Sequence, residues 1–238
     1  MPGTKADIIA QLQKDLLPLQ GFKHVANDNA IDTGLGPINH AFPNSVFPLG
    51  AIHEFIAEDT AATGGFIAGI LSALMQNGGA CLWISSWRTL FPPALLSFGI
   101  SPDQIIFIDL QKERDLLWAI EEALKCNGLA AVVGEIKELS FTASRRLQLA
   151  VEQSRVTGFI LRTKPTNTTA CVTRWKITSL PSELNDDMPG IGFPRWNIQL
   201  LKVRNGKPGS WQVEWVNGKF RPVIDVAFLV HEQQKKVG

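Results

Sequence analysis

The chain has 238 residues, of which 45% are hydrophobic and 19% are charged, and its formal net charge is +1. This composition argues against a disordered chain, because enough apolar side chains are present to offset the entropy lost on folding. The length suits one large domain with additional terminal elements. The longest apolar stretch, Phe66 to Met75, is shorter than the roughly 20 residues that cross a bilayer, and the N-terminus has no secretory signal pattern. We therefore expect a cytoplasmic protein that does not enter a membrane.

The near-neutral charge hides an asymmetry between the two halves of the chain. Residues 1–136 carry 7 basic and 14 acidic side chains, whereas residues 137–238 carry 16 basic and 8 acidic ones. A basic half favours an acidic partner, either nucleic acid or protein. The alternative is that both halves form one domain on whose surface the charges mix.

Residues 5–18 are predicted to form an amphipathic helix, because Ile8, Leu12 and Leu16 recur at intervals of four residues on one face. A stretch rich in turn-forming residues, from Gly21 to Gly50, separates this helix from the rest of the chain. We expect the three side chains to bind a partner or a second copy of the chain. Packing of the helix on its own domain is an equal alternative.

After Gly50, apolar runs of strand length alternate with helical patterns. Strands are predicted at 51–57, 80–85, 104–110, 129–136 and 158–162, and helices at 65–76, 113–126 and 142–155, with a short helix from Pro93 to near Gly99. Strands that are apolar on both faces and alternate with helices indicate an α/β fold, with a mostly parallel sheet that is covered on both sides.

Beyond Thr169 the pattern changes to strands without helices between them. CVTRWKITSL, RWNIQLLKVRN and WQVEWVNGKF are predicted as strands, and Asn205-Gly206 and Asn217-Gly218 are typical turns of antiparallel hairpins. We thus expect an N-terminal helix and linker at 1–32, a core at 33–222 that ends in antiparallel strands, and a tail at 223–238.

The strand, small-residue segment and helix at Ala51–Gln76 form the setting of a phosphate-binding loop. Such a loop needs glycines to bring backbone N–H groups around the phosphates, a lysine for the terminal phosphates and a Ser or Thr for Mg²⁺. In either alignment of AEDTAATGGF the lysine position holds Thr63 or Gly65, and no lysine occurs between Lys23 and Lys112. Two carboxylates in this segment would also repel a polyphosphate. The degenerate loop is therefore assigned to Ala57, Glu58, Asp59, Thr63, Gly64 and Gly65.

The strand LAAVVGEI has the apolar profile of a Walker B strand, but Gly134 stands where an aspartate would hold Mg²⁺, and Glu135 follows it. Phosphoryl transfer depends on positioning and charge stabilisation, and the residues for both are missing. The cysteines and histidines show no metal-binding spacing. We expect no ATP hydrolysis, no cofactor and no metal; the alternative is an ATPase with an unusual phosphate loop.

Cationic side chains gather in the second half of the chain, where several alternate with tryptophans. Such surfaces suit single-stranded nucleic acid, whereas the alternative is a sheet whose aromatic residues are covered by the stems of long cationic side chains. The candidate patch for DNA or a partner comprises Arg162, Lys164, Arg174, Lys176, Arg195, Lys202, Arg204 and Lys207.

Four separated segments together resemble one family. They are GAIHEFIAEDTAATGGF, ERDLLWAIEEALKCNGLAAVVGEI, LSFTASRRLQLAVEQS and PRWNIQLLKVRNGKPGSWQVEW, and the resemblance extends over roughly Thr33 to Val216. They are similar to ImuA, the RecA-like accessory protein of bacterial error-prone translesion synthesis. The segment before the first strand also looks like the entry to a RecA-type core.

The resemblance implies a RecA-like fold and a non-catalytic role in the SOS response. It implies an ImuB-like polymerase relative as a partner, with RecA as a second candidate, and contact with single-stranded DNA is left open. ImuA proteins have also been described as relatives of the division inhibitor SulA, which implies a third alternative, binding of FtsZ. The catalytic residues of RecA cannot be transferred, because Thr63 or Gly65 and Gly134 stand in their places.

Overall fold

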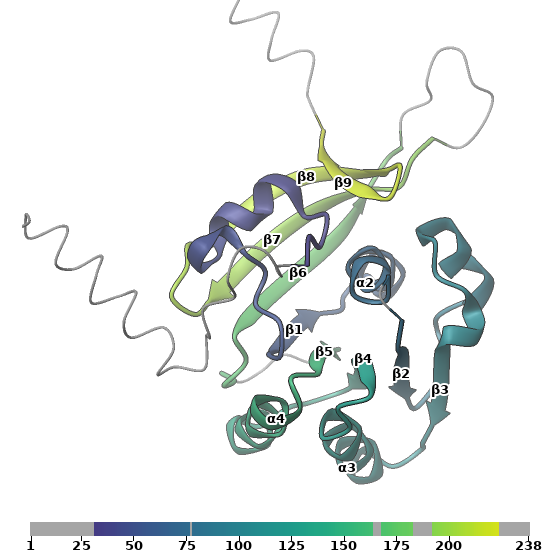
Figure 1. Cartoon of the computed structure of the whole chain (residues 1–238), viewed down its shortest axis with the longest axis vertical. Helices are drawn as coiled ribbons and strands as arrows, with labels where there is room; N and C mark the ends of the chain where they lie inside the picture. The colour runs from purple at the N-terminus through teal and green to yellow at the C-terminus, as the bar shows by residue number, and fades with distance from the viewer. Residues whose placement is uncertain (1–30, 77, 164–167, 183–191, 224–238) are drawn as a thin grey trace, which may run out of the picture.

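The computed structural model describes residues 31–76, 78–163, 168–182 and 192–223. Within these residues, nine strands form one mixed sheet in the order β3-β2-β4-β5-β1-β6-β7-β8-β9. Helices flank the sheet, so the predicted α/β class is confirmed (Figure 1). Nearly all of the predicted N-terminal segment 1–32, including the helix with Ile8, Leu12 and Leu16, and of the tail 223–238 lies outside the described residues.

Six neighbouring strands of the sheet run parallel. They are β3 (Ile105–Asp109), β2 (Ala80–Ser85), β4 (Leu129–Ile136), β5 (Thr157–Arg162), β1 (Ile52–Ile56) and β6 (Thr173–Leu180). The remaining three are antiparallel to their neighbours: β7 (Arg195–Val203), β8 (Gly209–Val216) and β9 (Lys219–Pro222). Both the parallel core and the antiparallel end were predicted, with strand ends shifted by a few residues.

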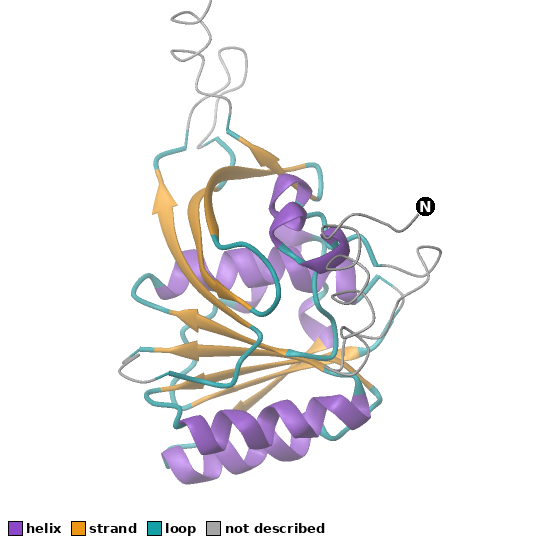
Figure 2. Cartoon of the chain, turned by 90° about the vertical axis from the view of Figure 1, so that its left-hand side faces the viewer, coloured by secondary structure: helices purple, strands orange, loops and turns teal. Residues whose placement is uncertain are grey.

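The helices divide between the two faces of the sheet. α3 (Glu113–Leu124) and α4 (Phe141–Ser154) lie together on one face, and α2 (Thr60–Leu74) lies on the other with the 3-10 helices η2 (Gly36–Ala41) and η4 (Pro92–Phe98) (Figure 2). Each face has its own apolar core. The side chains of Leu116, Ile120 and Leu124 point from α3 into one of them, as their four-residue spacing predicts.

The antiparallel half of the sheet bends over α2, so this helix is covered on several sides (Figure 1). Aromatic rings from the bent half pack directly on the helix backbone. A Cβ added at Gly69 would overlap the ring of Phe220, and one added at Gly65 would lie 3.2 Å from Cζ2 of Trp196. The glycines of α2 therefore allow a close approach between the helix and the sheet.

The largest correction to the predicted elements concerns the start of α2. The helix was expected from Gly65, but it begins at Thr60. Ser140 caps α4 by accepting a hydrogen bond from the Ala143 N–H, as favoured for serine at this position. Within the described ranges, no helix has the length and hydropathy of a membrane span.

Candidate functional site

The junction between β1 and α2 is not an open phosphate-binding loop. Only Ala57, Glu58 and Asp59 separate the strand from the helix, and Thr63, Gly64 and Gly65 belong to the first turns of α2. The prediction of a loop through Gly65 was therefore wrong. The loop had been assigned by aligning the segment to the spacing of a phosphate-binding motif, and this alignment extends past the residue at which the helix begins.

The N-terminus of α2 is occupied by a carboxylate of the chain itself. Oδ1 of Asp59 accepts a hydrogen bond from the Ala62 N–H at 2.9 Å, and Oδ2 accepts from the N–H and Oγ of Ser179 at 3.2 and 2.8 Å. The hydrogen bond from Ala62, together with those from Ser179, lowers the pKa of Asp59 although burial opposes the shift. The carboxylate thus fills the position where a helix N-terminus would bind a phosphate.

The residues at the two candidate lysine positions are enclosed. Thr63 is fully buried, and its hydroxyl donates to the backbone carbonyl of Asp59 at 2.7 Å. Gly65 faces the ring of Trp196. Glu58 is paired with Lys176, whose Nζ lies 2.7 Å from Oε2. The cation nearest to this segment among these contacts, Lys176, is therefore engaged by a carboxylate of the same segment.

The two candidate Walker B residues point to opposite faces of the sheet. Gly134 faces α3, where a Cβ would overlap Cδ1 of Ile120, so a carboxylate at this position would be directed into an apolar core. Glu135 points to the other face, where its Oε1 accepts from Nε1 of Trp83 at 2.6 Å and from the Thr89 hydroxyl at 3.4 Å. Burial raises the pKa of Glu135, while both hydrogen bonds oppose the rise.

Glu135 also lines a cavity of about 340 Å³ that we name the α2–η4 cavity. One face of α2 forms a wall and η4 forms another, with Trp83 and Trp196 contributed by β2 and β7. No pattern in the sequence predicted this cavity. The one local signal was the pair Leu90 and Phe91, large apolar residues in the connection between β2 and η4, where polar residues are usual. The lining residues are Thr60, Ala61, Gly64, Gly65, Ala68, Trp83, Thr89, Leu90, Phe91, Ala94, Leu95, Phe98, Glu135, Pro194 and Trp196.

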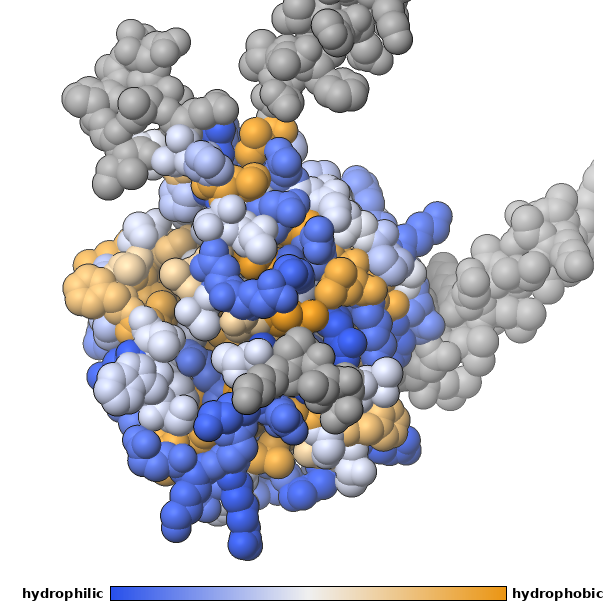
Figure 3. Space-filling view, turned by 180° about the vertical axis from the view of Figure 1, so that it is seen from behind, coloured by the Kyte–Doolittle hydropathy of each residue, from blue (hydrophilic) through white to orange (hydrophobic). Residues whose placement is uncertain are grey.

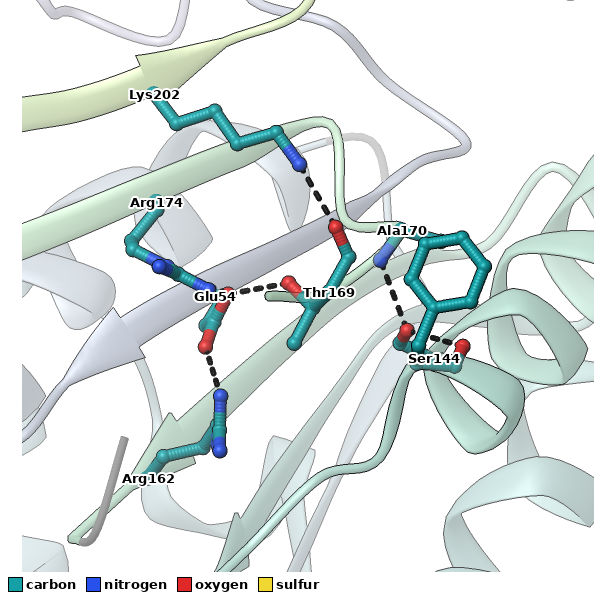
Figure 4. A network of polar contacts seen from close by, with 8 residues as sticks. Glu54, Ser144, Arg162, Thr169, Ala170, Arg174 and Lys202 are labelled. Atoms are coloured by element: carbon teal, nitrogen blue, oxygen red, sulfur yellow. Dashed lines mark hydrogen bonds and ion pairs between the residues drawn. The ribbon is translucent and has the colours of Figure 1, made fainter. Parts of the chain in front are cut away.

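The predicted basic patch includes a residue that is not on the surface. Arg162 is fully buried, and its Nη1 is paired with Oε1 of Glu54, which is buried as well. Oε2 of the same carboxylate accepts from Nε of Arg174 at 3.0 Å and from the Thr169 hydroxyl at 2.5 Å (Figure 4). The placement of Arg162 in a surface patch was therefore wrong, because its charge compensates a carboxylate inside the sheet.

Two further cations fix the backbone that leads into β6. Nζ of Lys202 donates to the Thr169 carbonyl and Nη2 of Arg204 donates to the Ala170 carbonyl, both at 2.8 Å (Figure 4 shows the first). Burial, with repulsion from Arg174 and Arg204, lowers the pKa of Lys202, although nearby anionic groups oppose this. Arg174, Lys202 and Arg204 thus form a half-buried cationic cluster.

The rest of the predicted patch is dispersed. Arg195 pairs with Glu214 at 3.1 Å within the antiparallel half of the sheet, and Lys176 pairs with Glu58. Lys207 is exposed on the turn that follows β7. Lys164 lies outside the described residues, as does the helix with Ile8, Leu12 and Leu16. Of the predicted side chains that the structure describes, Arg174, Lys202 and Arg204 therefore form the half-buried cluster, and Arg162 meets it only from inside the sheet, through Glu54.

Sequence comparison relates this chain to two kinds of known bacterial protein. No protein-family model matches the chain. Two relatives named Protein ImuA, from two strains of Caulobacter vibrioides, are each 34% identical over 191 residues, which cover 73% of this chain and 78% of theirs. Cell division inhibitor SulA of Photorhabdus laumondii is 30% identical over 96 residues, which cover 39% of this chain and 54% of SulA. The alignment with the two ImuA proteins is about twice as long as the alignment with SulA and covers most of both chains. This chain therefore belongs to the ImuA family.

Proposed function

We propose that this protein is a non-catalytic accessory factor of DNA-damage-induced, error-prone translesion synthesis, and that it acts by binding other macromolecules. Membership of the ImuA family supports the damage-response role. The observation that carries the non-catalytic role is the carboxylate of Asp59 at the N-terminus of α2. A nucleotide-hydrolysing enzyme of this architecture would hold a phosphate there.

The proposal includes a RecA-like core that has lost its catalytic residues. In support, β1 is the central strand of the nine-stranded sheet, lies between two parallel neighbours, β5 and β6, and leads directly into α2, as in phosphate-binding α/β folds. The lysine positions hold Thr63 and Gly65, both packed against other parts of the chain. Gly134 directs no ligand toward a metal on the α2 face. Under this proposal the fold is retained as a scaffold, and ATP is not hydrolysed.

The proposed partners follow from the family. An ImuB-like polymerase relative is the main one, and RecA is the second. We retain the hypothesis that Ile8, Leu12 and Leu16 bind a partner or a second copy of the chain. The cluster of Arg174, Lys202 and Arg204 is the candidate site for single-stranded DNA. Its three positive charges, with the one of Arg162, outnumber the single negative charge of Glu54, so the cluster keeps a net positive charge that can attract phosphates.

The proposal is tested by affinity purification of the tagged full-length chain from cells treated with a DNA-damaging agent, followed by mass spectrometry. Enrichment of an ImuB-like protein, with or without RecA, is the expected result. Untreated cells and a variant with Ile8, Leu12 and Leu16 replaced by serine are the controls. Absence of an ImuB-like protein, when the bait itself is recovered intact, would overturn the proposal.

A second candidate function, inhibition of cell division through FtsZ, is favoured by the likeness to SulA over 96 residues. Overproduction of the protein would then produce filamentous cells, and FtsZ would be enriched with the tagged chain. Normal division at a protein level that exceeds that of FtsZ contradicts this function. Neither result depends on the presence of an ImuB-like partner, so the two candidates are separable.

A further inference from the structure

The α2–η4 cavity opens beside exposed apolar side chains. Trp87, Phe91 and Leu96 are 77%, 68% and 62% exposed, and Phe91 also lines the cavity. All three lie between β2 and the end of η4, within ten residues of one another. Apolar surface gathers at the edge of the molecule where η4 lies (Figure 3). A cavity with an exposed aromatic rim is typical of a protein-binding surface.

The cavity contains an anionic group that has no cationic partner in the described part of the chain. Glu135 accepts hydrogen bonds from the uncharged groups of Trp83 and Thr89. Arg88, the neighbour of the lining residue Thr89, is itself paired with Asp109 at 2.8 Å and lies over the ring of Phe107. A half-buried carboxylate amid apolar groups is costly unless it is paired or protonated.

We propose that the α2–η4 cavity binds a segment of a partner polypeptide that presents an arginine or lysine beside an apolar side chain. The cation would pair with Glu135, and the apolar neighbour would pack on Leu90, Phe91 and Leu95. The lining on α2 begins in its first turn, at Thr60 and Ala61, but it does not include Asp59, whose carboxylate is engaged by the Ala62 N–H and by Ser179. The inference therefore does not rest on the proposed damage-response role.

Charge and size select this class of partner. The carboxylate of Glu135 repels phosphates, which excludes a nucleic-acid backbone as the occupant. A cavity of about 340 Å³ is at the small end of ligand sites and holds one or two side chains. Arginine is frequent among the residues that dominate binding at protein interfaces. Its apolar stem can pack on the apolar lining of the cavity while its guanidinium pairs with Glu135.

The test uses the full-length protein with ¹⁵N-labelled tryptophan, because the indole N–H of Trp83 donates to Glu135 and reports directly on this site. The probe is the peptide acetyl-Leu-Arg-Leu-amide, and acetyl-Leu-Gln-Leu-amide is the uncharged counterpart. The arginine peptide should shift the Trp83 indole resonance with a dissociation constant on the order of 1 mM. The glutamine peptide should bind at least about tenfold more weakly, because it cannot pair with the carboxylate.

Two variants separate charge from shape. Glu135→Gln keeps an acceptor for Trp83 but removes the charge, and Glu138→Gln is the matched control at an exposed position. Gly64→Leu fills the cavity; a Cβ there meets only Cδ1 of Leu90, at 3.7 Å, and the helix gains propensity, so the fold is expected to be kept. Gln153→Leu, exposed on α4, is its control.

Glu135→Gln should weaken binding of the arginine peptide at least about tenfold, and Gly64→Leu should abolish it, while both controls bind as wild type. Equal affinity for the two peptides, or unchanged affinity in Glu135→Gln, would overturn the role of charge and with it the proposal. No shift of the Trp83 resonance by the arginine peptide at roughly ten times the expected dissociation constant would overturn it as well.

Discussion

Asp59 and Ser179 are separated by 120 residues in the chain, and they meet where α2 begins, with Oγ of Ser179 2.8 Å from Oδ2 of Asp59. The other carboxylate oxygen accepts from the Ala62 N–H at 2.9 Å. One side chain thus caps the helix and joins it to the end of β6. Both oxygens are engaged within the chain, which is a direct structural reason to expect no phosphate at this position.

Replacing Asp59 tests this double role. Asp59→Ala removes the cap and the link to Ser179, and we expect a loss of about 1–2 kcal/mol in the free energy of unfolding. Asp59→Asn should lose less, because asparagine is also a favoured cap. Urea unfolding followed by circular dichroism measures both. Equal stability of Asp59→Ala and wild type would show that the cap contributes nothing.

Mg-ATP should neither bind nor be hydrolysed. A ligand that binds only the native state raises its stability in proportion to the logarithm of concentration, so the melting temperature is expected to stay constant as Mg-ATP is added. Phosphate release should not exceed that of a mock purification. A rising melting temperature together with phosphate release would instead support an ATPase with an unusual loop.

The buried carboxylate of Glu54 should be essential for stability. Glu54→Gln removes the charge of a carboxylate that is paired with the fully buried guanidinium of Arg162, and we expect a loss of about 3–5 kcal/mol in the free energy of unfolding. Glu122→Gln, which breaks an exposed pair with Lys125, is the matched control and should have little effect, because solvent screens exposed ion pairs. Chemical unfolding of the two variants compares them; similar losses would contradict a structural role for the network.

His53 should make the stability depend on pH. Its Nε2 donates to the Pro48 carbonyl at 2.8 Å, and its Nδ1 lies 2.7 Å from the Thr173 hydroxyl, which can donate to it, so both nitrogens have partners when the ring is neutral. Burial lowers the pKa of His53 to about 3, against the smaller opposing effect of the Pro48 hydrogen bond. Below its ordinary pKa of about 6.5 the unfolded state binds the proton and the folded state does not.

The contribution of His53 is therefore fully present above pH 6.5 or so, and it is lost as the pH falls toward the folded pKa of about 3. We expect a slope approaching about 1.4 kcal/mol per pH unit in the free energy of unfolding. His53→Gln should remove this slope, whereas His40→Asn, a change at an exposed histidine, should keep it. An identical pH dependence in His53→Gln and wild type contradicts the prediction.

Restoring a Walker B acid at Gly134 should destabilise the protein and give no activity. Even the Cβ of Gly134→Ala would overlap Ile120, and overpacking of this kind costs about 1–3 kcal/mol. Gly134→Asp should cost more, because it also buries a carboxylate without a partner. Ile120→Val combined with Gly134→Ala should recover part of the loss, and the thermal unfolding of a double-mutant cycle measures this coupling.

Several features of this fold could be predicted from the sequence because their signals are local. Apolar runs that alternate with helical patterns indicated the parallel strands, and the turn at Asn217-Gly218 preceded an antiparallel strand as expected. The start of α2 was missed for a local reason too. Its first turns contain Gly64 and Gly65, and glycine has a low helix propensity. The rings of Trp196 and Phe220, which favour glycine at two positions of this helix, come from strands that are distant in sequence.

The composition of the candidate sites was harder to predict than the strands and helices, because it depends on contacts between distant parts of the chain. From the sequence alone it followed that the segment between β1 and α2 contains no lysine at the phosphate-binding position, since residues 24–111 contain none. The sequence could not indicate that Arg162 forms a buried ion pair with Glu54, which is 108 residues away. Nor could it indicate that Glu135 faces a cavity while Gly134 faces α3. A charge pairs with whatever the strand register places beside it, and a strand residue faces one side or the other according to which layer of helices covers it. The sequence thus determined which chemical groups the protein has, and the register and layering of the sheet decided which of them are compensated and which remain available to a partner.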